Sequence, residues 1–128
     1  MAGNRVAYWL EIAYYDLATG KAMLATGRWL YVGFMCCQVI EKALKAVISR
    51  DGALPSKIHD LGRLAELGAI YAAMDDEQKT FLEKLQPFQI EARYPESRNR
   101  LLKQLNEQVC SQLMTATEDM ALWIKAKL

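Results

Sequence analysis

The chain has 128 residues, enough for one domain and too few for two independent cores. Apolar residues make up 52 % and charged residues 24 %, the balance of a folded globular protein rather than a disordered chain. The formal charge of +1 excludes a strongly basic protein that coats nucleic acids and a chain with an acidic tail, although it allows a local basic patch. Three prolines and seven glycines are few for the many tight turns of an all-β fold, so the composition predicts a small helical domain.

Three long stretches have the apolar spacing that is typical of helices. Along residues 4–26, apolar side chains recur every three or four positions and form one stripe. Residues 28–51 carry apolar side chains on nearly all sides, which predicts a central helix. Residues 98–126 repeat the stripe pattern at the end of the chain. Gly27 is expected to end the first helix and Gly52 the second.

Two shorter helices are expected in the middle of the chain. Asp60 is placed to cap one of them, and Gly68 interrupts its apolar pattern. Asp75 and Gln78 have the spacing of a capping box, which opens the other. Pro87 is expected to bend or end that second short helix.

Residues 91–97 are expected to form a loop, because Pro95 disfavours a helical backbone at Tyr94. No internal repeat, low-complexity tract or linker interrupts the pattern. The sequence therefore predicts an all-α fold, an up-and-down bundle of four or five helices that forms one domain over residues 1–128.

The longest uncharged stretch, from Trp29 to Ile40, is shorter than the roughly 20 residues that span a bilayer. The first residues have no apolar segment typical of a signal peptide, so we expect a cytoplasmic protein with no membrane attachment. The apolar surroundings of Cys36 and Cys37 indicate core residues. One histidine and no paired-cysteine motif predict no metal requirement and no cofactor.

Polar side chains form a stripe on the otherwise apolar second helix. Gln38, Glu41 and Lys45 share one face of it. Glu41 and Lys45 are four residues apart, so a solvated ion pair explains them. The alternative is that the stripe lines a cleft or meets a partner.

His59 is the only histidine of the chain. The structural interpretation is that it caps a turn or forms a hydrogen bond to the neighbouring helix. The alternative is that it acts as an acid or base in catalysis, since its ordinary pKa lies near neutrality.

A second candidate region is the local excess of positive charge made by Arg93, Arg98, Arg100 and Lys103. A solvated helix start explains this excess. The alternative is that Arg93 beside Tyr94 contacts phosphate or a base.

Several motifs follow one another along nearly the whole chain. They are Trp9, Ala13, Asp16 and Leu17, then Gln38-x-x-Glu41-Lys42-x-x-Lys45-Ala46, then His59-Asp60-Leu61, then Ala92-Arg93-Tyr94-Pro95. This ordered set resembles the HEPN domain family, named for higher eukaryotes and prokaryotes nucleotide-binding, and its small prokaryotic stand-alone type.

The resemblance implies a helical bundle similar to the helical domain of kanamycin nucleotidyltransferase. It implies a homodimer with a cleft where the two central helices approach each other. Small prokaryotic members are commonly encoded beside a minimal nucleotidyltransferase in toxin–antitoxin-like pairs. Many other members are metal-independent ribonucleases, marked by an arginine and, several residues later, a histidine near the start of the last helix.

The chain departs from the ribonuclease pattern, because no histidine follows Arg93. We therefore expect a protein that binds a nucleotide or RNA and docks a minimal nucleotidyltransferase, without catalysing a reaction. The resemblance places Glu41, Lys45, Arg93 and Tyr94 in the binding cleft, with Gln38 and His59 as further candidates. One alternative is a ribonuclease in which Arg93 stabilises the transition state and another group moves the proton. The other is a purely structural dimerisation module.

A homodimer is also expected from the residues themselves. The second helix is apolar over too much of its circumference for short neighbours to cover, and large apolar patches are uncommon on monomers. Trp29, Phe34 and Met35 are the expected contributors to the interface.

Overall fold

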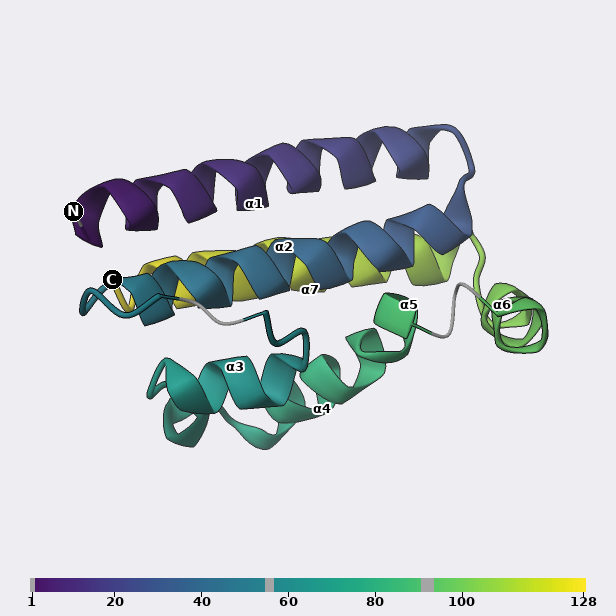
Figure 1. Cartoon of the computed structure of the whole chain (residues 1–128). Coiled ribbons are helices and arrows are strands. Elements are labelled where there is room, and N and C mark those ends of the chain that lie inside the picture. The colour runs from purple at the N-terminus through teal and green to yellow at the C-terminus, as the bar shows by residue number, and fades with distance from the viewer. Residues whose placement is uncertain (1, 55–56, 91–93) are drawn as a thin grey trace.

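The computed structural model of the chain (Figure 1) describes residues 2–54, 57–90 and 94–128. Within these ranges the regular structure is helical and no strand occurs, so the predicted all-α fold is confirmed. No helix in the described part is both long and apolar enough to cross a membrane. The elements are α1 (Ala2–Ala25), α2 (Trp29–Ser49), α3 (Leu61–Leu67), a 3-10 helix (Tyr71–Ala73), α4 (Asp76–Leu85), α5 (Pro87–Ile90), α6 (Pro95–Lys103) and α7 (Glu107–Lys125).

Three long helices, α1, α2 and α7, pack together along their lengths (Figure 1). Gly27, with a φ of 73°, lets the chain turn back between α1 and α2, so these two run antiparallel. Helix α7 runs parallel to α2, because α3 to α6 carry the chain back to the end where α2 begins. Arg50 Nη1 accordingly bonds the carbonyl of Lys127 at 2.8 Å, near the C-terminal ends of both helices.

Helix α2 is the centre of the fold, as predicted. Its apolar side chains are buried around most of its circumference by α1 and α7, with α3 and α5 beneath it. Trp29, Phe34 and Met35, expected at a dimer interface, are partly buried within the single chain. The two long helices, together with α3 and α5, therefore cover most of α2, and the argument from an uncovered apolar face does not hold. The homodimer stays a prediction.

The end of the chain differs from the prediction. The expected loop over 91–97 already becomes helical at Pro95, where α6 begins, although Tyr94 is extended as predicted. The expected single helix over 98–126 is two helices, and Figure 1 shows α6 crossing the direction of α7. The break lies at Asn106, whose backbone is extended and whose side chain accepts a hydrogen bond from Val109 N at 2.8 Å. A cap of this kind starts a new helix inside a continuous apolar pattern.

The two short helices in the middle follow the prediction closely. Asp60 caps α3 by accepting a hydrogen bond from Arg63 N at 3.0 Å. Asp75 and Gln78 form the predicted capping box at the start of α4. Pro87 ends α4 and begins the single turn α5.

The approach of α5 to α2 depends on a glycine. Phe88 is buried, and its ring lies where a side chain on Gly33 would stand. The absent side chain therefore lets α5 sit directly on α2, and the next residue of α5, Gln89, is buried there too.

This contact gives a first prediction. Gly33→Ala should lower the free energy of unfolding by about 1–3 kcal/mol, because the added methyl group displaces the Phe88 ring. Gly20→Ala is the control, since the nearest atom there is the flexible end of Met114, and its loss should be smaller. Urea denaturation followed by circular dichroism measures both. Equal losses at the two positions would contradict this account of α5.

Candidate functional site

A buried carboxylate, Glu41, lies in the middle of α2 and is only 2 % exposed. Its Oε1 atom accepts a hydrogen bond from Gln89 Nε2 at 2.5 Å and lies 3.1 Å from His59 Nδ1. Its Oε2 atom accepts hydrogen bonds from Lys45 Nζ at 3.2 Å and Lys42 Nζ at 3.3 Å. Both oxygens are therefore satisfied, which is the condition for keeping a charge inside a protein.

Glu41 is held in its ionised form. Burial by itself raises the pKa of this carboxyl group, because it disfavours the charged state. The charge of Lys42, the hydrogen bond to His59 and the charge and hydrogen bond of Lys45 outweigh burial. The pKa of Glu41 therefore lies below its ordinary value of 4.5.

Two glutamines complete the arrangement. Gln38 Nε2 donates to Gln89 Oε1 at 3.0 Å, and Gln38 Oε1 accepts from Lys42 Nζ at 2.7 Å. Since Lys42 and Gln89 also bond Glu41, four side chains form a closed ring of hydrogen bonds. We refer to the following residues as the Glu41 cluster: Gln38, Glu41, Lys42, Lys45, His59 and Gln89.

The cations of the cluster differ in exposure. The Lys45 side chain is 8 % exposed, and its Nζ lies 5.4 Å from the centre of the Trp9 ring as well as beside Glu41. The His59 side chain is 59 % exposed and reaches from the buried carboxylate to solvent. The Lys42 side chain is intermediate at 17 %. His59 and Lys42 are therefore the groups that a ligand can reach, and Lys45 supports them from inside.

A second carboxylate acts on the cluster from α1. Burial raises the pKa of Asp16; the positive charge of Lys42 works against this shift and the negative charge of Glu41 adds to it. Asp16 thus reduces the positive excess of the cluster when it is ionised.

His59 is fixed by its backbone as well as by its ring. The side chain of Gln86, at the end of α4, donates to the carbonyl of His59 at 3.3 Å and accepts from Leu61 N at 2.8 Å. The segment before α3 is therefore tied to α4 while the ring is tied to α2.

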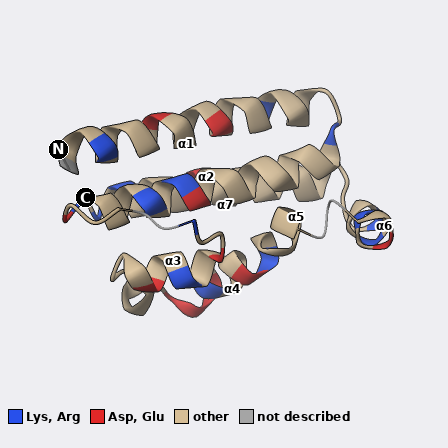
Figure 2. Cartoon of the chain, in the orientation of Figure 1, with Lys and Arg blue, Asp and Glu red and all other residues tan. Residues whose placement is uncertain are grey.

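The structure brings together four of the residues that the sequence predicts for the site. Gln38, Glu41, Lys45 and His59 all belong to the Glu41 cluster, and Figure 2 shows that the charges of α2 gather in the half toward its C-terminus. Tyr94 lies instead at the start of α6 and is 61 % exposed. Arg93, the predicted phosphate contact, lies outside the described residues.

Sequence reasoning missed Gln89. The only signal was a polar residue between the apolar Phe88 and Ile90, and nothing in the spacing connects it to Glu41, which is 48 residues away. The sequence indicates Lys42 as a polar residue of the second helix, but not as a member of the site.

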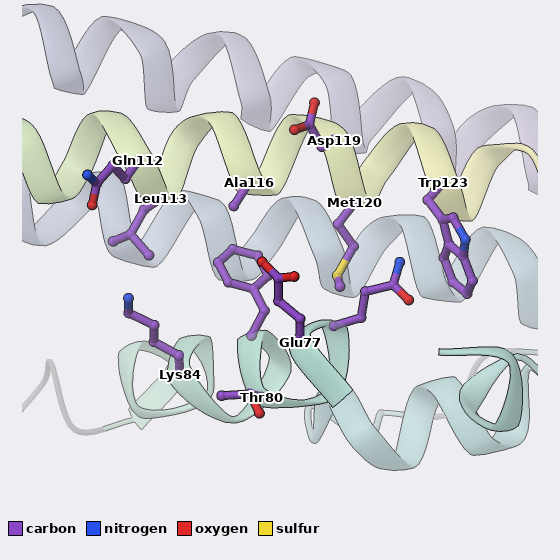
Figure 3. A pocket seen from close by; sticks show the side chains of 11 residues that line it. Glu77, Thr80, Lys84, Gln112, Leu113, Ala116, Asp119, Met120 and Trp123 are labelled. Carbon is purple, nitrogen blue, oxygen red and sulfur yellow. The ribbon is translucent and has the colours of Figure 1, made fainter. Parts of the chain in front are cut away.

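A groove of about 530 Å³ lies elsewhere, between α4 and α7 (Figure 3). Apolar side chains of both helices line it, including Phe81, Met120 and Trp123. Glu77 and Asp119 are also among its lining residues. These two carboxylates outnumber Lys84, the one cation among the lining residues, which disfavours a phosphate, so the Glu41 cluster is the better candidate for an anionic ligand.

The cysteines are core residues, as predicted. Burial raises the pKa of the Cys36 thiol to about 11 and that of Cys37 to about 12. Cys110 is buried as well, and burial likewise raises its pKa. In the described part of the chain, no group of three or more His, Cys, Asp or Glu side chains is placed to hold a metal ion.

The sequence profile of the HEPN domain matches residues 6–127, essentially the whole chain. The chain belongs to the HEPN domain family. This membership supports, at the level of the family, a helical protein that binds a nucleotide or RNA. The crystal structure of TT1696 from Thermus thermophilus has a similar fold, with a TM-score of 0.84 over 98 % of this chain and 99 % of that one. The sequence identity is 20 %, so this likeness concerns the fold alone. No curated protein matches the chain.

The buried charge of this HEPN domain gives a second prediction. Glu41→Gln should lower the free energy of unfolding by about 3 kcal/mol near neutral pH, because Lys45 then stays buried without its counter-charge. Ionised Glu41 stabilises the fold above its ordinary pKa of 4.5 and loses this effect as the pH falls through its lower folded pKa. The difference between wild type and variant should therefore shrink in urea titrations as the pH is lowered below 4.5.

Glu66→Gln is the control, because Glu66 pairs with Arg63 at the surface, where such pairs contribute about 0–1 kcal/mol. A pH-independent loss for Glu41→Gln, or an equal loss for Glu66→Gln, would contradict the account of Glu41.

Proposed function

We propose that this HEPN protein binds a nucleotide or RNA through a phosphate at the Glu41 cluster. One observation carries the proposal: two lysines and a histidine surround a single buried, ionised carboxylate, and the histidine faces solvent. Charged hydrogen bonds from such groups are the usual means of binding phosphate. Asp16 opposes the positive excess, but burial weakens its ionisation.

In this proposal His59 and Lys42 contact the phosphate, since they are the exposed members of the cluster. Lys45 contributes its charge from inside. Arg93 adds a phosphate contact and Tyr94 a face for base stacking, as the family resemblance implies. The exposure of Tyr94 supports the stacking role.

The proposal extends to partners. We expect the chain to form a homodimer and to act with a minimal nucleotidyltransferase in a toxin–antitoxin-like pair, as resemblance to small prokaryotic HEPN proteins implies. Light scattering tests the first expectation, since a dimer has twice the mass of the chain. Co-purification with the product of an adjacent nucleotidyltransferase gene tests the second.

A metal-independent ribonuclease is the second candidate function, and one observation favours it. The Glu41 carboxylate and the His59 ring form a pair in which an acid orients an imidazole, the arrangement of many general bases. His59 would then move the proton that the histidine of the ribonuclease motif moves in other members of the family. RNA cleavage in EDTA that His59→Asn abolishes would support this function over binding alone.

The binding site gives a third prediction. Lys42→Ala should weaken binding of a short oligoribonucleotide about tenfold or more, because it removes a charged contact with phosphate. Lys103→Ala on the exposed face of α6 is the control and should weaken binding less, mainly through salt-dependent attraction. Calorimetric titration at fixed salt measures both, and thermal melting verifies that Lys42→Ala is folded. Equal effects of the two variants would exclude a site at the cluster.

Arg93 gives a fourth prediction. Arg93→Ala should cost about 1.5–3 kcal/mol of binding energy and leave the melting temperature nearly unchanged, if the arginine meets phosphate as the resemblance implies. A lower melting temperature with intact affinity would show instead that Arg93 holds the bundle together.

A further inference from the structure

We propose that binding of a phosphodiester at the Glu41 cluster is coupled to uptake of one proton by His59, with Glu41 as the positioning residue. This inference rests on the proposed function and goes further, because it states how the site is regulated. It concerns the ring nitrogen that faces away from Glu41, and it follows from how that ring is held.

The ring of His59 has one nitrogen engaged inside the protein. Nδ1 lies 3.1 Å from Oε1 of Glu41, which is 2 % exposed and ionised. A carboxylate is only an acceptor, so the neutral ring must carry its proton on Nδ1 to make this hydrogen bond. The other nitrogen, Nε2, is then a lone pair on a side chain that is 59 % exposed.

A phosphate oxygen is also an acceptor. In neutral His59, Nε2 and the phosphate oxygen therefore present lone pairs to each other and form no hydrogen bond. Protonation converts Nε2 into a charged donor while Nδ1 keeps its bond to Glu41. The imidazolium is thus the form that fits both the buried carboxylate and the ligand.

The charges around His59 act on its protonation in opposite directions, so a bound ligand can shift it. Glu41 favours the imidazolium, whereas Lys42 and Lys45 on the same helix oppose it. From α1, the carboxylate of Asp16 interacts with Lys42 and Glu41 of the cluster. Gln89 on α5 and Gln86, which follows α4, are neutral. On the His59 segment itself, Lys57 is exposed, and the carboxylate of Asp60 is engaged with Arg63 N at the start of α3. An added phosphate beside Nε2 shifts the balance toward protonation, and by linkage protonation strengthens phosphate binding by the same factor.

The test uses an oligouridylate with hydroxyl groups at both ends. Terminal phosphates titrate near pH 6 themselves, whereas internal diesters keep their charge. We expect the dissociation constant of the wild type to rise roughly fivefold or more from about pH 5 to about pH 8 at constant salt. His59→Gln, whose amide can donate at any pH, should bind with an affinity that no longer depends on pH. Lys103→Ala should keep the wild-type pH dependence.

Nitrogen-15 NMR of the His59 ring provides a readout that needs no variant. We expect the neutral ring to carry its proton on Nδ1, and the midpoint of its titration to move upward when oligouridylate is added. A proton on Nε2, equal wild-type affinity at both pH values, or an unchanged pH dependence in His59→Gln would each overturn the inference alone. Absence of binding at either pH would overturn the proposed function together with it.

Discussion

The site depends on one constraint: an ionised carboxylate inside an apolar bundle must be compensated from several directions. Glu41 lies on the helix that the rest of the chain covers, so water cannot supply its hydrogen bonds. Lys42 and Lys45 compensate it from its own helix. Gln89 and His59 arrive from α5 and from the segment before α3. The charge on α2 thus holds α5 and the segment before α3 against the same helix.

The packing of the short helices serves this compensation. Gly33 leaves room for Phe88, and that contact places α5 where Gln89 can reach the carboxylate. Gln86 holds the backbone of His59 at the other side. Each contact sets a position along α2, so the polar ring and the apolar core specify the same arrangement of helices.

The sequence was sufficient where structure is set locally. Periodic stripes predicted α1 and α2 to within a few residues, and the caps Asp60 and Asp75 acted as expected. It failed at Asn106, because a cap inside an apolar stripe breaks the helix while the stripe continues beyond it. The site followed the same division. Gln38, Glu41, Lys45 and His59 could be selected by spacing and residue type, but Gln89 required knowledge of how α5 packs.

The interpretation of the polar stripe on α2 as a solvated ion pair is wrong, and the reason is physical. Glu41 and Lys45 are spaced as a helix-surface ion pair, yet both are buried, so their pairing is obligatory rather than marginal. A pair that must persist is a poor ligand site by itself, because a phosphate would have to displace Glu41 from Lys45. The same pair can support a ligand site beside it, because it holds the Glu41 carboxylate in a fixed position. The hydrogen bond to this fixed carboxylate orients the His59 ring, whose other nitrogen lies on an exposed side chain. The buried residues therefore set the geometry of the candidate site, and the exposed histidine is the group that a ligand can contact.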